Sequence, residues 1–577
     1  MACSAGGYIG VDVFFVISGF LITTIIVREI AAQNFSIASF YERRVRRILP
    51  AIMAVVIFCL VVGSLLLETG DFENLARSSI ANNLFPSNIY FYFQTGYFDA
   101  PAELKPLLHT WSLSVEEQYY LIFPLLLLLI ARYCSRKYLH FLLPLLLLWF
   151  AACVHGMSQD PSAVFYFLPT RGWELLIGSV LAIAAIPPLL NTIGRNALAL
   201  LGLALIVYSV AAFNDDTLFP GSIAAIPTIG SALVIYAGAS GATLVSRLLS
   251  IRPMVFIGLI SYSLYLWHWP LIAFAKYYKA VDLSRLEELQ LLLVIFMAAV
   301  LSWRFIETPF RRKRLLAARK PLFVASLTAT ALLIAAELSF TLTGDDAEWK
   351  HWEECKERLV DPADLDSLCS IGADNGEPRF LFWGDSHART LAPGVNASAI
   401  RHGAAGVFAT NTACPPLWNI DRPGRTDCHE FNVAVLDYVS RHAAIDTVVI
   451  AACWTLSVRG TRYKDEDGDL VEVVDITAPA GDPRTSRELF EAGLRGTVSA
   501  LRDLGKRVVI VGPVPEIGYS VPATNHIAKI TGRDVNEMIA PSIEEFRERN
   551  SEILEVIKRL EDEGAVEVVR PAGIIVQ

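Results

Sequence analysis

A serine follows a short apolar run in FLFWGDSHA, where Ser386 lies between Asp385 and His387. A serine hydroxyl attacks an acyl carbonyl when a general base takes its proton. Ser386 is therefore the candidate nucleophile, and Gly384, Asp385 and Asn411 are the candidate supports of its site. A Gly-Asp-Ser turn is common at strand ends, so this interpretation depends on the elements around it.

The region after residue 378 alternates short apolar runs with helical stretches. Strands are predicted at 379–383, 406–410, 446–452, 507–512 and 565–569, and helices at 387–402, 429–443, 486–504 and 541–562. This alternation predicts an α/β domain with a doubly wound parallel sheet. In such sheets reactive groups lie beyond the carboxyl ends of the strands. Ser386 follows the first strand and opens a helix, whose amide groups can bind an oxyanion.

The chain has 577 residues, 54% of them hydrophobic, but this average hides two different parts. Residues 1–343 are long apolar runs, 344–378 read as a connector, and 379–577 form the α/β domain. About ten membrane spans are predicted, near 11–27, 48–67, 113–131, 138–154, 170–186, 197–213, 222–239, 253–275, 289–306 and 321–343. The sequence thus predicts a polytopic α-helical membrane bundle followed by a soluble domain. No basic patch with interleaved aromatic residues indicates nucleic acid.

Lysine and arginine collect in every second loop between the predicted spans. The basic loops are 41–48, 132–137, 247–252 and 311–320. Positive loops face the cytoplasm, so residues 344–577 and the first ten residues are expected outside it. An external amino terminus needs a signal peptide or a preceding helix, and MACSAGGYIG resembles neither. We therefore expect that a first helix is missing.

Two cysteine pairs lie in the external part, Cys355 with Cys369 and Cys414 with Cys428, each pair 14 residues apart. Four cysteines permit three pairings, but two disulfides are plausible in an oxidising compartment. No Cys-x-x-Cys or His/Cys cluster has the spacing of metal ligands, so no metal is expected.

Five polar residues fall in or near apolar spans, where ionisable groups are costly and usually functional. They are Asp12, His109, Glu116, Arg171 and Glu174. Arg171 and Glu174 are three apart and share a helix face. A structural ion pair and a substrate contact remain equally open for them.

Four arginines, Arg43, Arg44, Arg46 and Arg47, crowd the start of one predicted span. They fit the usual enrichment of arginine and lysine at the cytoplasmic ends of membrane spans. Their density also suits an anionic, phosphorylated donor that approaches from the cytoplasm.

Six segments resemble, in order, the acyltransferase family 3 membrane proteins, in the subgroup fused to an external SGNH-type domain. They are GGYIGVDVFFVISGFLIT, YERRVRRILPA, LKPLLHTWSLSVEEQYYLIFPLLL, FYFLPTRGWELLIGSVLA, ISYSLYLWHWPL and SWRFIETPFRRK, spread across residues 6–313. The GDSHA segment adds the outer, SGNH-hydrolase-like domain. Glu116, Arg171 and Glu174 match polar family positions, and the four arginines match the family's arginine motif.

The resemblance implies an enzyme of the bacterial inner membrane. It would transfer an acyl group, usually acetyl, from cytoplasmic acetyl-CoA to a hydroxyl of an extracytoplasmic envelope polysaccharide. Acceptors in the family include lipopolysaccharide O-antigen and peptidoglycan. Two other functions stay open: a glycan transporter or flippase with a binding outer domain, and an envelope acyl esterase that uses Ser386.

The sequence departs from the family at two places. The family's first helix carries an arginine and an expected catalytic histidine before the segment that matches Gly7, and here the chain begins after them. SGNH enzymes take their general base from an Asp-x-x-His segment near the C-terminus. No histidine after Ser386 has an aspartate three residues before it: His387, His402, His429, His442 and His526. We therefore expect a chain truncated at both ends and crippled in acyl transfer.

Overall fold

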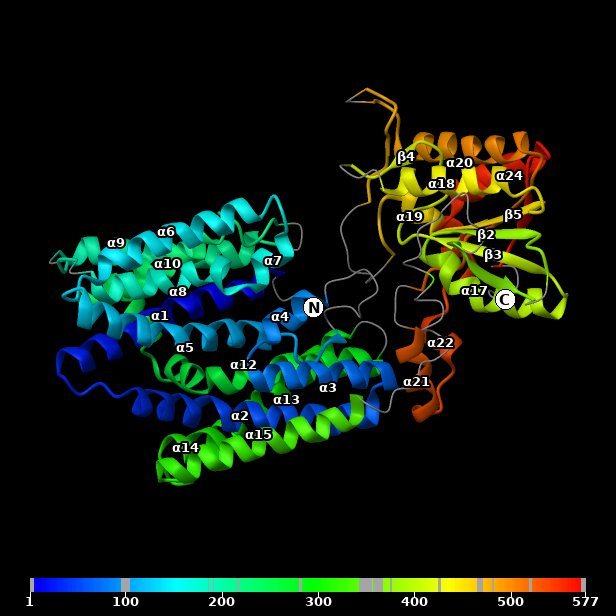
Figure 1. Cartoon of the computed structure of the whole chain (residues 1–577). Coiled ribbons are helices and arrows are strands. Elements are labelled where there is room, and N and C mark those ends of the chain that lie inside the picture. The colour runs from blue at the N-terminus through cyan, green and yellow to red at the C-terminus, as the bar shows by residue number, and fades with distance from the viewer. Residues whose placement is uncertain are drawn as a thin grey trace. The chain divides into compact units, whose positions relative to one another are not determined.

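The computed structural model describes residues 5–94, 104–184, 186–189, 191–214, 217–279, 283–341, 355, 367–373, 376–423, 427–463, 471–479, 482–517 and 521–571. The chain divides into two compact units. Residues 1–344 form most of the first, and residues 345–577 form most of the second. The first is helical, and the second combines helices with a sheet (Figure 1).

Eight helices of the described residues are long and apolar enough to cross a membrane. They contain α1 (Gly10–Ala31), α2 (Ile37–Leu66), α5 (Thr110–Tyr133), α6 (Tyr138–Gly156), α9 (Thr192–Ala212), α12 (Arg252–Lys279), α13 (Arg285–Ser302) and α15 (Arg319–Thr341). Their outward faces carry exposed leucine, isoleucine and phenylalanine side chains. Such faces suit contact with lipid.

Two of the ten predicted spans are shorter than expected. The segments at 170–186 and 222–239 form α8 (Leu168–Ile183) and α10 (Ala225–Ala239), of 16 and 15 residues. At 1.5 Å per residue these helices reach about 24 Å, less than the roughly 30 Å hydrocarbon core of a bilayer. Helices therefore occupy all ten segments that hydropathy predicts as spans, eight of them long and two, α8 and α10, shorter.

Helix α8 packs backbone to backbone against α1. A Cβ atom on Gly19 would lie 1.9 Å from the carbonyl oxygen of Leu175, and one on Gly178 would lie 2.0 Å from that of Val16. Only glycine permits such an approach. Small residues commonly let membrane helices pack this closely.

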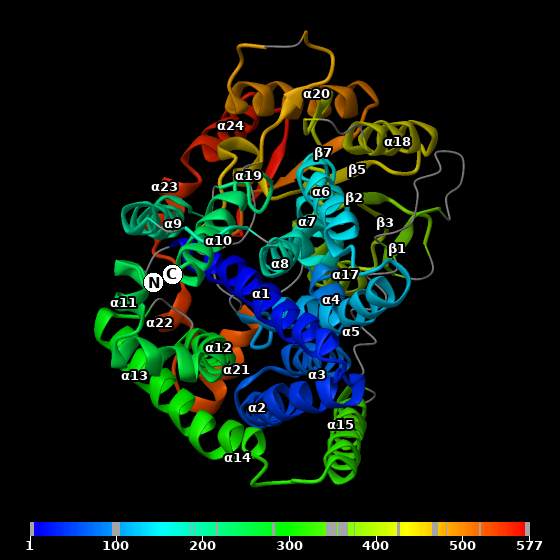
Figure 2. The ribbon, with the colours of Figure 1, turned by 90° about the vertical axis from the view of Figure 1, so that its left-hand side faces the viewer.

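Between α2 and α5 the chain forms α3 (Thr69–Leu84) and α4 (Ser87–Tyr92), where the sequence suggests only a loop. Helix α3 packs against α2 and α15 (Figure 2). Its polar side chains Ser79, Asn82 and Asn83 are buried. A span count from hydropathy misses α3, because this helix is too polar and too short to cross a membrane.

The second unit is built on a six-stranded sheet in the order β1-β3-β2-β5-β7-β8. These strands are β1 (Cys369–Gly372), β2 (Phe380–Gly384), β3 (Ala405–Thr410), β5 (Thr447–Ala451), β7 (Arg507–Val511) and β8 (Glu567–Val569). All neighbours are parallel except β1, which pairs antiparallel with β3. The segment expected to be a connector therefore supplies an edge strand.

Helices cover both faces of this sheet. They are α17 (Ser386–Arg401), α18 (Asp427–Arg441), α19 (Trp454–Arg459), α20 (Ser486–Asp503) and α24 (Ser551–Asp562). The chain also forms the shorter helices α21 (Val521–Thr531), α22 (Val535–Ile539) and α23 (Ile543–Arg549) between β7 and α24. The helix predicted at 541–562 is broken at Asn550. In β2, Leu381 and Trp383 join one buried apolar cluster while Phe382 joins the other, as the alternation of strand side chains requires.

The parallel strands follow a doubly wound order. Strand β2 comes first in the chain, β3 lies on one side of it, and β5, β7 and β8 follow on the other. The connections therefore diverge at the carboxyl end of β2. Crevices at such switch points are where doubly wound sheets bind their ligands.

Candidate functional site

The segment Gly384–Ser386 forms a tight turn at this switch point. Gly384 ends β2 and pairs with Thr410 of β3 and Ala451 of β5. Asp385 is the N-cap of α17, and Ser386 is its first residue. The turn is thus surrounded by the carboxyl ends of three strands. Its sequence positions Ser386 where reactive groups of such sheets lie.

Asp385 ties these strand ends together. Its Oδ1 accepts a hydrogen bond from the His387 backbone N–H at 2.8 Å, and its Oδ2 accepts one from the Cys453 N–H at 2.9 Å. The Thr410 hydroxyl donates to the Asp385 carbonyl at 2.9 Å. Burial raises the pKa of the Asp385 carboxyl, although electrostatic interactions with His387 and Arg422 and the two backbone N–H bonds oppose that shift.

Gly384 and Asn411 lie against the same turn. A Cβ on Gly384 would sit 1.8 Å from the Ala451 carbonyl oxygen, so the close packing of β2 and β5 demands glycine here. The Asn411 backbone N–H donates to the Gly384 carbonyl at 3.2 Å. The structure therefore brings Gly384, Asp385 and Asn411 together around Ser386.

Ser386 is only 4% exposed. Within the described residues, no side chain donates a hydrogen bond to its hydroxyl or accepts one from it. His402 and His442 instead contact carbonyl groups of their own helices through Nδ1. Neither of these two histidines is therefore placed as the general base for Ser386.

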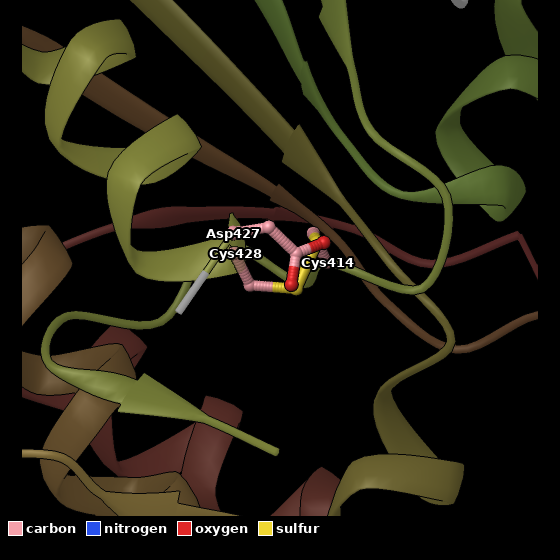
Figure 3. A group of neighbouring side chains, drawn as sticks. All are labelled: Cys414, Asp427 and Cys428. Atoms are coloured by element: carbon pink, nitrogen blue, oxygen red, sulfur yellow. A yellow bond between two sulfur atoms is a disulfide. The ribbon is translucent and has the colours of Figure 1, made fainter. Parts of the chain in front are cut away.

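Two disulfides brace this unit, Cys355 with Cys369 and Cys414 with Cys428. Ligand atoms of Cys414, Asp427 and Cys428 lie within 4.8 Å of one another, a spacing that also suits a metal ion. Figure 3 shows that the two sulfur atoms of this group are bonded to each other. Sulfur ligates metals as a thiolate, so the group fits a metal only after reduction.

In the helical unit, Arg171 bridges two carboxylates. Its guanidinium lies 3.1 Å from Asp12 on α1 and 3.0 Å from Glu174 on α8, and all three side chains are fully buried. Four aromatic rings surround it, with the nearest centroid, that of Phe219, 5.3 Å away. The spacing of Arg171 and Glu174 predicts their pair, while Asp12 joins them from a distant segment.

Glu116 forms a second buried polar group. The hydroxyls of Ser18 and Tyr120 both donate to its Oε1, Ser18 at 2.5 Å. The Arg44 guanidinium lies 4.4 Å from the centroid of the Tyr120 ring. Spacing gives no hint of Ser18, because α1 and α5 are far apart in sequence.

The four arginines of α2 have different surroundings. Arg46 is buried, donates to Glu42 at 3.0 Å and binds the carbonyls of Leu316 and Ala317. Arg43 pairs with Glu29 at an exposed site. Arg44 and Arg47 are half-buried and act electrostatically on Glu117. They are three residues apart and so share a helix face.

His109 immediately precedes α5 and is buried beside His268 and Tyr265 of α12, with ring centroids 5.6 and 5.2 Å away. A further buried acid, Glu337 of α15, accepts hydrogen bonds from Ser79 and Asn83 of α3. The sequence does carry a signal for Glu337, a carboxylate within an apolar span. Its partners lie on α3, a helix that hydropathy alone does not reveal.

These features define a class: a polytopic membrane protein with a doubly wound α/β domain that presents a serine at its switch point. The family described as "Acyltransferase domain" matches residues 4–308, and the one described as "SGNH domain (fused to AT3 domains)" matches residues 354–577. The chain therefore belongs to the acyltransferase 3 family, in the group with a fused SGNH domain.

Named relatives share about a third of their aligned residues with this chain. The O-acetyltransferase OatA of Staphylococcus aureus (strain MRSA252) is 30% identical over 375 residues, which are 61% of this chain and 62% of the relative. The peptidoglycan O-acetyltransferase OatA of Listeria monocytogenes serovar 1/2a is 33% identical over 325 residues, 53% and 52% of the two chains. This chain thus spans less than two thirds of either relative. No solved structure matches it with comparable significance.

Proposed function

We propose that this protein is a membrane O-acyltransferase that moves an acetyl group from cytoplasmic acetyl-CoA to a hydroxyl of an envelope glycan. The observation that carries the proposal is Ser386, placed at the switch point of an SGNH domain in a chain of the acyltransferase family. The Listeria relative's name makes peptidoglycan the first acceptor to test. Lipopolysaccharide O-antigen is the second.

In this proposal, the Ser386 hydroxyl attacks the carbonyl carbon of an acyl donor and a general base takes its proton. The bond between the acyl carbon and the donor's leaving group then breaks, and the leaving group takes that proton from the base. The start of α17 carries partial positive charge, which favours the oxyanion that forms. Asp385 holds the turn through two backbone N–H groups. The acyl-serine is then attacked by a sugar hydroxyl, which forms the ester and frees Ser386.

We propose that Arg44 and Arg47 bind the phosphates of the donor. Both are half-buried on one face of α2, whereas the guanidinium of Arg46 is already taken up by Glu42 and two carbonyls. Arginine forms forked hydrogen bonds to phosphate. The basic ends of the spans would then face the cytoplasm, which puts the SGNH domain, with its two disulfides, outside it.

The test measures ester-linked acetate on peptidoglycan and, separately, on lipopolysaccharide. Cells would carry the wild-type gene, no gene, Ser386→Ala, or Ser440→Ala as an exposed serine control. We expect acetate on one glycan to fall in the deletion and Ser386→Ala strains and to stay normal in the control. A rise in acetate on deletion would support the esterase instead. Unchanged acetate on both glycans would refute the proposal.

A further inference from the structure

His268 has a fixed hydrogen-bonding pattern. Its Nδ1 lies 2.6 Å from the backbone carbonyl oxygen of Tyr265, one turn earlier in α12. A carbonyl oxygen only accepts hydrogen bonds, so Nδ1 carries the proton. The neutral ring then has its lone pair on Nε2. Among the described residues, no group donates a hydrogen bond to that nitrogen.

His109 lies beside it without a side-chain partner. Its side chain is only 7% exposed. By distance and angle, neither ring nitrogen has a hydrogen-bond partner among the described residues. The Leu266 backbone is near enough to interact electrostatically with the ring. Buried polar atoms are nearly always paired, and an unpaired imidazole points to a group that binds there. The rings of His109 and His268 are 5.6 Å apart and are not hydrogen-bonded to each other.

The surrounding contacts lock these two rings in place. The Tyr265 hydroxyl donates to the His109 carbonyl, so its oxygen accepts from the Ser112 hydroxyl, which lies 2.9 Å away. The Trp269 indole N–H donates to the Lys105 carbonyl at 2.9 Å. Together these bonds fasten α12 to the start of α5. Reactive groups work best when such a frame fixes them.

We propose that His268 and His109 form a second reactive site, in the helical unit, which binds an alcohol hydroxyl and activates it for acyl transfer. This proposal rests on the acyltransferase function proposed above. The hydroxyl oxygen attacks the carbonyl carbon of an acyl thioester while its proton moves to His268 Nε2. The C–S bond then breaks, and the leaving thiolate takes that proton from Nε2. His109 holds the hydroxyl with its unpaired ring nitrogen.

The test compares two substitutions of His268 in the full-length protein, reconstituted with labelled acetyl-CoA and a glycan acceptor. In His268→Asn, the side-chain amide retains a donor near the position of Nδ1 and lacks the Nε2 base. A purely structural role predicts normal activity for this variant. We expect kcat to fall about 100- to 10,000-fold, the usual contribution of a general base, with little change in KM. His268→Gln, which lacks the base as well, should fall equally. His155→Asn, at an exposed site on α6, is the control.

Two further arms separate the possible failures. In the first, the Ser386→Ala protein is given labelled acetyl-CoA and the glycan acceptor. If the glycan still becomes labelled, the activated alcohol is a sugar hydroxyl. If the glycan is no longer labelled, the activated alcohol is the serine. Diethyl pyrocarbonate, which acylates free imidazole nitrogens, should modify His268 in the wild-type protein even if no transfer is seen. Wild-type protein without transfer therefore refutes the proposed function. Full activity in His268→Asn, or a His268 that resists the reagent while His155 reacts, overturns the second site.

Discussion

The Ser386 turn and the Arg171 group are both buried polar sites, but they are stabilised in different ways. Around Ser386, one carboxylate accepts two backbone N–H groups and a hydroxyl donates to the adjacent carbonyl. Around Arg171, one guanidinium compensates two carboxylates from different helices. The first site therefore rests on neutral backbone groups and the second on a balance of full charges. Loss of one partner should be far more costly at the second site.

Arg171→Met is the sharpest test of this contrast. It leaves the carboxylates of Asp12 and Glu174 buried without a countercharge. Removal of one member of a buried ion pair costs about 3–5 kcal/mol. We expect the detergent-solubilised protein to unfold at a markedly lower temperature than the wild type. The triple variant Asp12→Leu, Arg171→Met, Glu174→Leu removes every charge and should recover most of that stability. No recovery would show that the charges are not the cause.

The disulfides offer a matched pair within the second unit. Both join cysteines 14 residues apart, so the chain-entropy model gives each about 3 kcal/mol. Replacing Cys414 and Cys428 by serine should therefore lower thermal stability as much as replacing Cys355 and Cys369. Acyl transfer should separate them. Cys414 lies beside the turn, where its N–H donates to the Asn411 carbonyl at 3.2 Å. Loss of the disulfide between Cys414 and Cys428 should therefore impair transfer more than loss of the other disulfide. Equal transfer in both double variants would contradict this.

The sequence predicts the features that adjacent residues encode better than those that join distant segments. The five parallel strands and the place of Ser386 follow from local patterns, because a strand, a turn and an N-cap are encoded by adjacent residues. The pair of Arg171 and Glu174 is likewise local. The edge strand β1 was not predicted, because its pairing with β3 depends on a distant segment.

Distant side chains in the helical unit could not be predicted either. The contacts of Ser18 with Glu116 and of Ser79 with Glu337 join helices about 98 and 258 residues apart. Hydropathy identifies spans but does not tell which helix faces meet. It also overestimates the lengths of α8 and α10, which have 16 and 15 residues. The four arginines also read as one cluster, although the structure gives Arg46 different partners from the rest.

Asp385→Ala tests the turn itself. It removes the acceptor of the His387 and Cys453 N–H groups together with the N-cap of α17. Loss of such a cap and its bonds costs about 1–2 kcal/mol, less than Arg171→Met. Transfer should fall as well, because the turn that holds Ser386 loosens. Asp385→Asn retains one acceptor oxygen, so its thermal stability and its transfer activity should both lie between those of the wild type and those of Asp385→Ala.

The pH dependence of Asp385 gives the smallest and most specific effect. Burial raises the pKa of its carboxyl in the folded protein above the unfolded value of about 3.9. The protonated carboxyl is therefore favoured by folding, and its contribution to stability is complete below about pH 4. It declines as pH rises through the folded pKa. His387 and Arg422 face this carboxyl and moderate the shift.

The measurement follows the unfolding temperature of the wild type and of Asp385→Asn from pH 4 to pH 8. The wild type should lose stability relative to the variant as pH rises, since only the wild type must bury a charge. If the unfolding temperature of the wild type instead rises relative to that of Asp385→Asn as pH rises, the two N–H bonds to the charged carboxylate stabilise the fold more than its burial destabilises it. In that case the Ser386 turn would depend on a full charge, as the Arg171 group does, and the contrast between the two sites would be one of degree.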